Sequence, residues 1–168
     1  MKHIAIVARN IPPNFGGGGQ LALVYAKSLL AQGWRVTLLT DTYRPSPSGQ
    51  LEIRSSGWRP NFGRIFWKGG FFVYAIWHKL WLRRQIRSGD FDLVHCVSGH
   101  WLCLYALEVA NVSRVPSIFE TSLIGQDDAE SMKNDWFGDW KIKTALKANA
   151  IVYISPAFYR FGGPFESQ

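Results

Sequence analysis

Four consecutive glycines, at positions 16 to 19, are the part of the sequence best suited to bind a ligand. They follow an apolar run, Ile4 to Ala8, that predicts a buried strand, and they precede a helical pattern from Gln20 to Gln32. Free backbone N–H groups and the helix dipole favour an anion at a helix N-terminus, and glycine lets the anion approach the main chain. We therefore expect a phosphate-binding loop formed by Gly16, Gly17, Gly18 and Gly19. A flexible turn without a ligand is the alternative.

A dinucleotide is one candidate for the phosphate ligand. The segment from Gly17 to Ala22 fits the pattern G-x-G-x-x-A, and Asp41 ends the second apolar run where a ribose-binding carboxylate is expected. However, the eight residues from Arg9 to Gly16 separate the first strand from the pattern, whereas a dinucleotide site needs a tight turn directly after the strand. A nucleotide- or dinucleotide-binding module therefore stays a second hypothesis. A Walker loop is excluded, because no Gly-Lys-Ser/Thr follows the glycines.

Polar side chains follow two later predicted strands, at residues 91–97 and 115–119. Open α/β sheets bind ligands at the carboxyl ends of their strands, so these side chains are candidates for lining a cleft. They are His100, Glu120, Asp127 and Asp128. For either aspartate the alternative is the cap of a following helix, and for His100 it is a structural histidine at a helix start.

A metal site is not expected, although two histidines and two cysteines lie close together, His95, Cys96, His100 and Cys103. No CxxC or HxxxH spacing is present, so packing in the core explains them better. Two cysteines make no disulfide framework and are typical of reduced thiols in a cytosolic protein. No secretory signal and no run of eighteen apolar residues is found, and we expect a cytoplasmic protein.

A basic, aromatic stretch lies within the helix predicted over residues 71–86 and just after it. The whole chain carries 19 Lys and Arg against 12 Asp and Glu, which favours anionic partners. Trp and Arg together suit a membrane interface, so this stretch predicts contact with an anionic membrane at the inner face. The candidates are Trp77, Lys79, Trp81, Arg83, Arg84 and Arg87. A core-packing helix with a solvated basic end is the alternative. Nucleic acid is not expected, because the charges follow no recognised binding motif.

Strands and helices alternate along the 168 residues, which predicts one α/β domain with a Rossmann-like, open, mostly parallel sheet and helices on both faces. Strands are predicted at residues 4–8, 36–39, 51–55, 91–97, 115–119 and 150–154, and helices at 20–32, 71–86, 101–109 and 140–148. The segment 122–138 is polar and acidic and is predicted to be irregular. The chain stops about fourteen residues after its last predicted strand, as half of a larger protein would.

Four segments, in order, resemble the amino-terminal half of GT-B glycosyltransferases of family GT4. The loop Pro12-Pro13-Asn14-Phe15-Gly16-Gly17 comes first, and Leu21 to Thr40 looks like the helix and strand that follow it in that family. Asp90 to His95 is similar to its DxVH strand, and Lys147 to Ser155 to its A-D-x-V-x-x-S strand. Together these segments cover nearly all of the chain.

The resemblance implies a retaining glycosyltransferase that takes its sugar from a nucleotide-diphosphate donor, with no further cofactor. It implies that residues 1–168 are the acceptor-side half of a GT-B architecture, with the glycine loop facing the donor phosphates. The acceptor is expected to be a glycan or lipid-linked, as in polysaccharide biosynthesis. The third hypothesis is a non-catalytic domain that docks on an anionic membrane.

The sequence departs from the family at two points. Many members have a histidine shortly after the strand that matches Ser117 to Phe119, and by position Ser122 or Thr121 takes that place here. Ser122 therefore joins the acceptor-cleft candidates, and no catalytic residue is assigned. The carboxy-terminal domain, which holds the nucleotide in this family, is also absent from the sequence. The isolated chain is then expected to bind donor poorly and to turn over nothing.

Overall fold

Six parallel strands form one open sheet in the order β3-β2-β1-β4-β5-β6, which confirms the Rossmann-like α/β fold. The computed structural model describes residues 1–12, 17–41, 51–57, 69–123 and 125–155. The strands are β1 (His3–Val7), β2 (Arg35–Thr40), β3 (Glu52–Ser55), β4 (Leu93–Val97), β5 (Ser117–Thr121) and β6 (Ala150–Tyr153). The helices are α1 (Gly17–Ala31), α3 (Gly69–Ser88), α4 (Trp101–Val112), α5 (Ala129–Asn134) and α6 (Gly138–Ala145).

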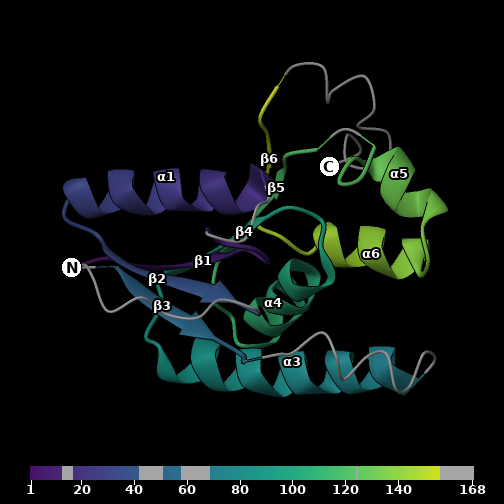
Figure 1. Cartoon of the computed structure of the whole chain (residues 1–168), viewed down its shortest axis with the longest axis horizontal. Coiled ribbons are helices and arrows are strands. Elements are labelled where there is room, and N and C mark those ends of the chain that lie inside the picture. The colour runs from purple at the N-terminus through teal and green to yellow at the C-terminus, as the bar shows by residue number, and fades with distance from the viewer. Residues whose placement is uncertain (13–16, 42–50, 58–68, 124, 156–168) are drawn as a thin grey trace.

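Helices cover both faces of the sheet, as the sequence predicts. Helix α1 lies on one face, and α3 and α4 lie on the other (Figure 1). Alternate residues of β1 divide between two cores, with Ile4 and Ile6 packed under α1 and Ala5 and Val7 packed on the opposite side. A strand buried on both faces carries a continuous apolar run rather than an alternating one, which is why the first strand is recognisable in the sequence.

Two segments differ from the predicted elements. Helix α1 begins at Gly17, three residues earlier than predicted, so Gly17, Gly18 and Gly19 form its first turn rather than a loop. Glycine costs up to about 1 kcal/mol relative to alanine in a helix interior, and in the first turn its N–H has no partner within the helix. The predicted irregular segment 122–138 contains helix α5, whose start is set by the side chain of Asp128.

Some predicted features lie outside the described residues. They include Gly16, most of the Pro-Pro-Asn-Phe loop, the Pro/Ser/Gly-rich segment 42–50 and the end of the chain after Ser155.

Candidate ligand-binding cleft

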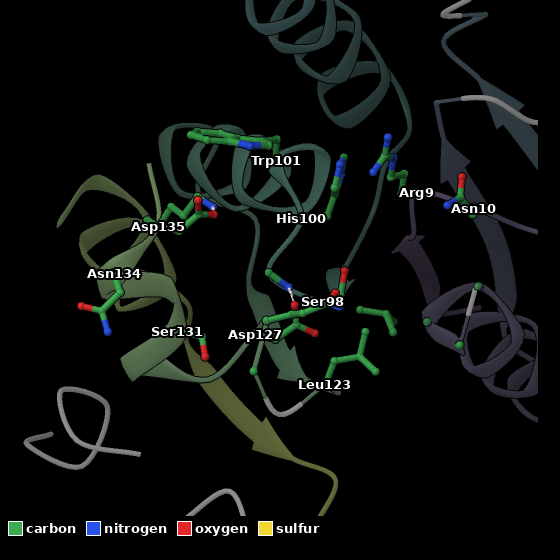
Figure 2. A pocket seen from close by; sticks show the side chains of 18 residues that line it. Arg9, Asn10, Ser98, His100, Trp101, Leu123, Asp127, Ser131, Asn134 and Asp135 are labelled. Carbon is green, nitrogen blue, oxygen red and sulfur yellow. Dashed lines mark hydrogen bonds and ion pairs between the residues drawn. The ribbon is translucent and has the colours of Figure 1, made fainter. Parts of the chain in front are cut away.

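A cavity of about 820 Å³ lies at the carboxyl end of the sheet, where β1, β4 and β5 end. The loop after β1 and the first turn of α1 form one wall, and the segments after β4 and β5 and helices α5 and α6 form the others (Figure 2). We call this cavity the cleft. Its lining includes Arg9, Asn10, Gly17, Gly18, Gly19, Ser98, Gly99, His100, Trp101, Gln126, Asp127, Asn134, Asp135 and Lys141.

The glycines of the first turn of α1 border the cleft in different ways. A Cβ atom on Gly19 would lie 1.4 Å from the carbonyl oxygen of Asn10, so the helix start packs directly on the loop after β1. A Cβ atom on Gly18 would lie 3.6 Å from the carbonyl oxygen of Val97, an ordinary contact, and one on Gly17 would meet nothing within 4 Å. Packing therefore requires glycine at position 19, while Gly17 leaves open space.

His100 both caps a helix and lines the cleft. Its Nδ1 accepts a hydrogen bond from the backbone N–H of Leu102 at 3.2 Å, at the start of α4. Burial and the positive charge of Arg9, toward which the ring lies in Figure 2, lower the pKa of His100 to about 3. The imidazole is therefore neutral at physiological pH, and because Nδ1 accepts, its proton resides on Nε2. His100 can donate a hydrogen bond, but it has no free nitrogen to act as a base.

Asp127 joins the two loops that follow β4 and β5. Its Oδ1 accepts the N–H of Gly99 at 2.9 Å, and its Oδ2 accepts the hydroxyl of Ser122 at 3.1 Å. Burial raises the pKa of Asp127 above that of a free aspartate. Asp127 lines the cleft, whereas Ser122 is not among its lining residues. These bonds hold the two loops in a common arrangement around the cleft.

Asp128 caps helix α5, so its role is the alternative one, the cap of a following helix. Its carboxylate accepts the N–H groups of Ser131 at 2.9 Å and of Gly125 at 2.6 Å. Burial opposes ionisation, but these hydrogen bonds outweigh it and hold the pKa of Asp128 below its usual value. Asp128 is not among the residues that line the cleft.

The Asp128→Ala variant is expected to lose about 1 kcal/mol of unfolding free energy, because the first turn of α5 then lacks its cap. Asp128→Asn, which keeps a side-chain oxygen, is the control and is expected to lose less. Because the folded pKa is lowered, this stabilisation is present above the ordinary aspartate pKa of about 4 and falls away as the pH drops through the folded pKa. Urea unfolding at several pH values measures both effects, and equal losses for the two variants would argue against the cap.

Glu120 does not line the cleft, contrary to the placement expected from the sequence. It is fully buried beneath α1, where it accepts hydrogen bonds from His95 Nε2 at 2.7 Å and from the Tyr25 hydroxyl at 3.1 Å. The cause is the register of the sheet: Glu120 lies one residue before the end of β5 and on the face that α1 covers.

The cleft also contains Arg9, Ser98 and Lys141, which are not among the predicted site residues. Ser98 directly follows β4 and Arg9 lies two residues after the end of β1, so the rule of strand ends that selected His100 also finds them. Lys141 is 5% exposed, pairs with Asp135 and lies 4.6 Å from the ring centroid of Trp101. Nothing in the sequence marks this lysine, because its place in the cleft depends on how α6 packs against α4.

Asp41 is not available to a ribose in the cleft. It is 1% exposed, its Oδ2 accepts the hydroxyl of Tyr74 at 3.2 Å, and Arg9 Nε lies 3.8 Å from the same oxygen. It is absent from the cleft lining. The dinucleotide hypothesis needs this carboxylate to face the ligand, so the geometry argues against it.

The four possible metal ligands do not converge. Cys96 and Cys103 are buried in the core on the α4 side of the sheet, while His95 binds Glu120 on the α1 side and His100 faces the cleft. Among the described residues, no group of three or more His, Cys, Asp or Glu side chains is placed to hold a metal ion.

Comparison with known proteins identifies one family. The model for Glycosyltransferase Family 4 matches residues 15–161, and no curated protein matches the chain. Among solved structures, the N-terminal domain of trehalose-6-phosphate phosphatase from Candida albicans is similar over 99% of this chain and 43% of its own, with a TM-score of 0.68 and 14% identity.

Two further solved structures, each a complex with UDP, have the same fold. A UGT transferase from Siraitia grosvenorii matches 91% of this chain and 44% of its own, with a TM-score of 0.54 and 16% identity. UGT89C1 from Arabidopsis thaliana matches 95% of this chain and 49% of its own, with a TM-score of 0.56 and 18% identity. The chain thus spans less than half the length of each of these structures.

Proposed function

Because the chain belongs to glycosyltransferase family 4, we propose that it is the acceptor-side domain of a retaining glycosyltransferase that uses a nucleotide-diphosphate-sugar donor. The acceptor is a glycan or a lipid-linked saccharide. Neither a metal nor another cofactor takes part in the proposal.

The observation that carries this proposal is the composition of the cleft. The N-terminus of α1 contributes Gly17 and Gly18 at one wall, and the cations Arg9 and Lys141 lie in the same cavity. As the glycosidic bond of the donor breaks, negative charge develops on the leaving diphosphate, and N–H donors and cations held in place stabilise it. The UDP in two structures of the same fold is a ligand of this chemical class.

A second domain completes the donor site in this proposal. The solved structures of the same fold are more than twice as long as the part that matches this chain, and the family resemblance assigns the nucleotide to a carboxy-terminal domain. The 168 residues alone are then expected to bind donor weakly and to be inactive.

His100 offers a sharp test of the cleft in the two-domain enzyme. Asn at this position keeps a side-chain oxygen that caps Leu102, but its shorter side chain lacks the Nε2–H group of His100, a residue that lines the cleft. We expect His100→Asn to lower kcat/KM by about 10²-fold, as the loss of one preorganised donor does, with unfolding unchanged. His100→Ala is expected to lose activity and also about 1 kcal/mol of stability.

Release of nucleoside diphosphate from a panel of nucleotide sugars measures this activity. Wild-type turnover in His100→Asn would restrict His100 to its capping role. A two-domain protein that releases no diphosphate from any donor, with or without acceptor, would contradict the proposed function itself.

A further inference from the structure

The outer face of helix α3 is apolar although it points to solvent. Residues spaced three or four apart share one side of a helix, and on this side stand Phe72, Val73, Ile76, Trp77 and Leu80. Each exposes between 51% and 62% of its surface. A contiguous row of large exposed apolar side chains marks an interaction surface rather than an ordinary solvated face.

The same face continues into a cluster of arginines. Arg83, Arg84 and Arg87 are exposed in the last turns of α3, and the helix contains no acidic residue. In the described part of the chain, no carboxylate lies within ion-pair distance of these three guanidinium groups. We call Phe72, Val73, Ile76, Trp77, Leu80, Arg83, Arg84 and Arg87 together the outer face of α3.

The opposite side of α3 holds the helix on the domain. Leu82 and Ile86 are buried in the core, and Trp81 packs against it. Lys79 pairs with Glu108 of α4, Nζ to Oε2, at 2.8 Å. The expected membrane contacts Lys79 and Trp81 are therefore not part of the exposed row, since Lys79 pairs with α4 and Trp81 packs against the core. Of the outer face, Trp77 also ties α3 to the segment after β3, because its indole N–H donates to the carbonyl oxygen of Ser56 at 3.2 Å.

The exposed apolar surface reaches the rim of the cleft. The ring of Phe71, in the first turn of α3, lies 4.7 Å from Trp101 and 5.0 Å from Trp136, measured between ring centroids. Trp101 lines the cleft, and Trp136 and Phe137 expose 61% and 45% of their surfaces. The outer face of α3 and the mouth of the cleft are thus joined through aromatic side chains.

We propose that the outer face of α3 docks on a lipid bilayer that carries anionic headgroups. The apolar row enters the boundary between headgroups and acyl chains, and the arginines bind lipid phosphates. A second copy that packs through its own outer face of α3 fits less well, since that face brings apolar area but no carboxylate for the arginines. In the described part of the chain, no helix is both long and apolar enough to cross a membrane.

Docking here deepens the proposed function, on which the following consequence rests. A cleft whose rim lies beside a membrane-bound helix receives acceptors that carry a lipid anchor. Binding to vesicles needs neither donor nor turnover, so failure of the docking proposal is distinguishable from failure of the glycosyltransferase proposal.

Vesicle co-sedimentation of the wild-type chain tests the docking. Vesicles of phosphatidylcholine alone are compared with vesicles of phosphatidylcholine and phosphatidylglycerol in equal parts. We expect binding to the anionic vesicles that weakens as NaCl is raised. The double variant Arg83→Glu/Arg84→Glu is expected to bind them at least about tenfold more weakly. The double variant Ile76→Ser/Leu80→Ser is expected to bind the vesicles about tenfold or more weakly, because it removes two of the apolar side chains that enter the bilayer.

The matched control is Val24→Ser/Lys27→Glu on α1, which lies on the opposite face of the sheet (Figure 1). Val24 is 60% exposed and Lys27 is also exposed, so the control changes a similar surface without touching α3. It is expected to bind like the wild type. Equal losses in the control and the α3 variants, or no preference for anionic vesicles, would overturn the proposal. A dimer would also overturn the proposal, if sedimentation velocity shows that Ile76→Ser/Leu80→Ser dissociates it and the wild type binds no vesicles.

Discussion

The Gly19→Ala variant is expected to unfold with about 1–3 kcal/mol less free energy than the wild type and to lose donor binding in the two-domain enzyme. The added methyl group would lie 1.4 Å from the carbonyl oxygen of Asn10 and 2.6 Å from its carbon. Both atoms belong to the backbone, so no side chain can rotate away. The loop after β1 and the first turn of α1 must move apart, and these two segments form one wall of the cleft.

Gly17→Ala is the control for this variant, since it makes the same change two residues earlier in the same turn. A Cβ atom there meets nothing within 4 Å, and alanine is favoured over glycine in helices by up to about 1 kcal/mol. Stability is therefore expected to stay equal or to rise. Urea unfolding compares the two variants. If they unfold alike, close packing of Gly19 on Asn10 does not set the position of the helix start.

The Glu120→Ala variant is expected to lose about 3–5 kcal/mol, the largest effect predicted here, because it removes one member of a buried polar cluster. The His95 Nε2 and the Tyr25 hydroxyl would both lose their partner beneath α1. Burial, and after it the nearby negative charge of Glu120, raise the pKa of Tyr25 to about 12, so the hydroxyl keeps its proton and donates it to Glu120 at physiological pH.

Tyr25→Phe removes only one hydrogen bond of this cluster and is expected to cost about 1 kcal/mol. The double variant Glu120→Ala/Tyr25→Phe is expected to lose less than the sum of the single losses, because both single changes break the same bond. Denaturant unfolding of the wild type and the three variants gives the four unfolding free energies of this double-mutant cycle. Strictly additive losses would show that the hydroxyl of Tyr25 and the carboxylate of Glu120 do not stabilise each other.

The fold follows from patterns that are local in the sequence. Runs such as Ile4 to Ala8 are apolar throughout because a central parallel strand is buried on both faces, and their alternation with helical periods predicts the open sheet. The sequence does not predict the short helix α5, since six residues carry too little periodicity and only the cap at Asp128 indicates it. The glycine run predicts a loop, although three of its residues form the first turn of α1.

The sequence predicts those parts of the cleft whose residues follow the ends of strands. His100 and Asp127 line it, because the carboxyl ends of parallel strands meet at one edge of the sheet. Glu120 belongs to the strand itself, and the register of β5 directs it beneath α1. Lys141 enters the cleft from a helix far along the chain, so no spacing within the sequence could place it there.

The sequence by itself thus determines the strands, the helices and the glycines at the start of the first helix, since each depends on neighbours a few positions away. Its composition determines the excess of positive charge. Only tertiary packing decides which polar groups meet in the cleft and which side of α3 is left exposed. Trp77 and Trp81 illustrate the difference: they lie four residues apart in one helix, yet Trp77 is 51% exposed and Trp81 packs against the core. The rotation of α3 on the sheet, set by contacts distant in sequence, separates them.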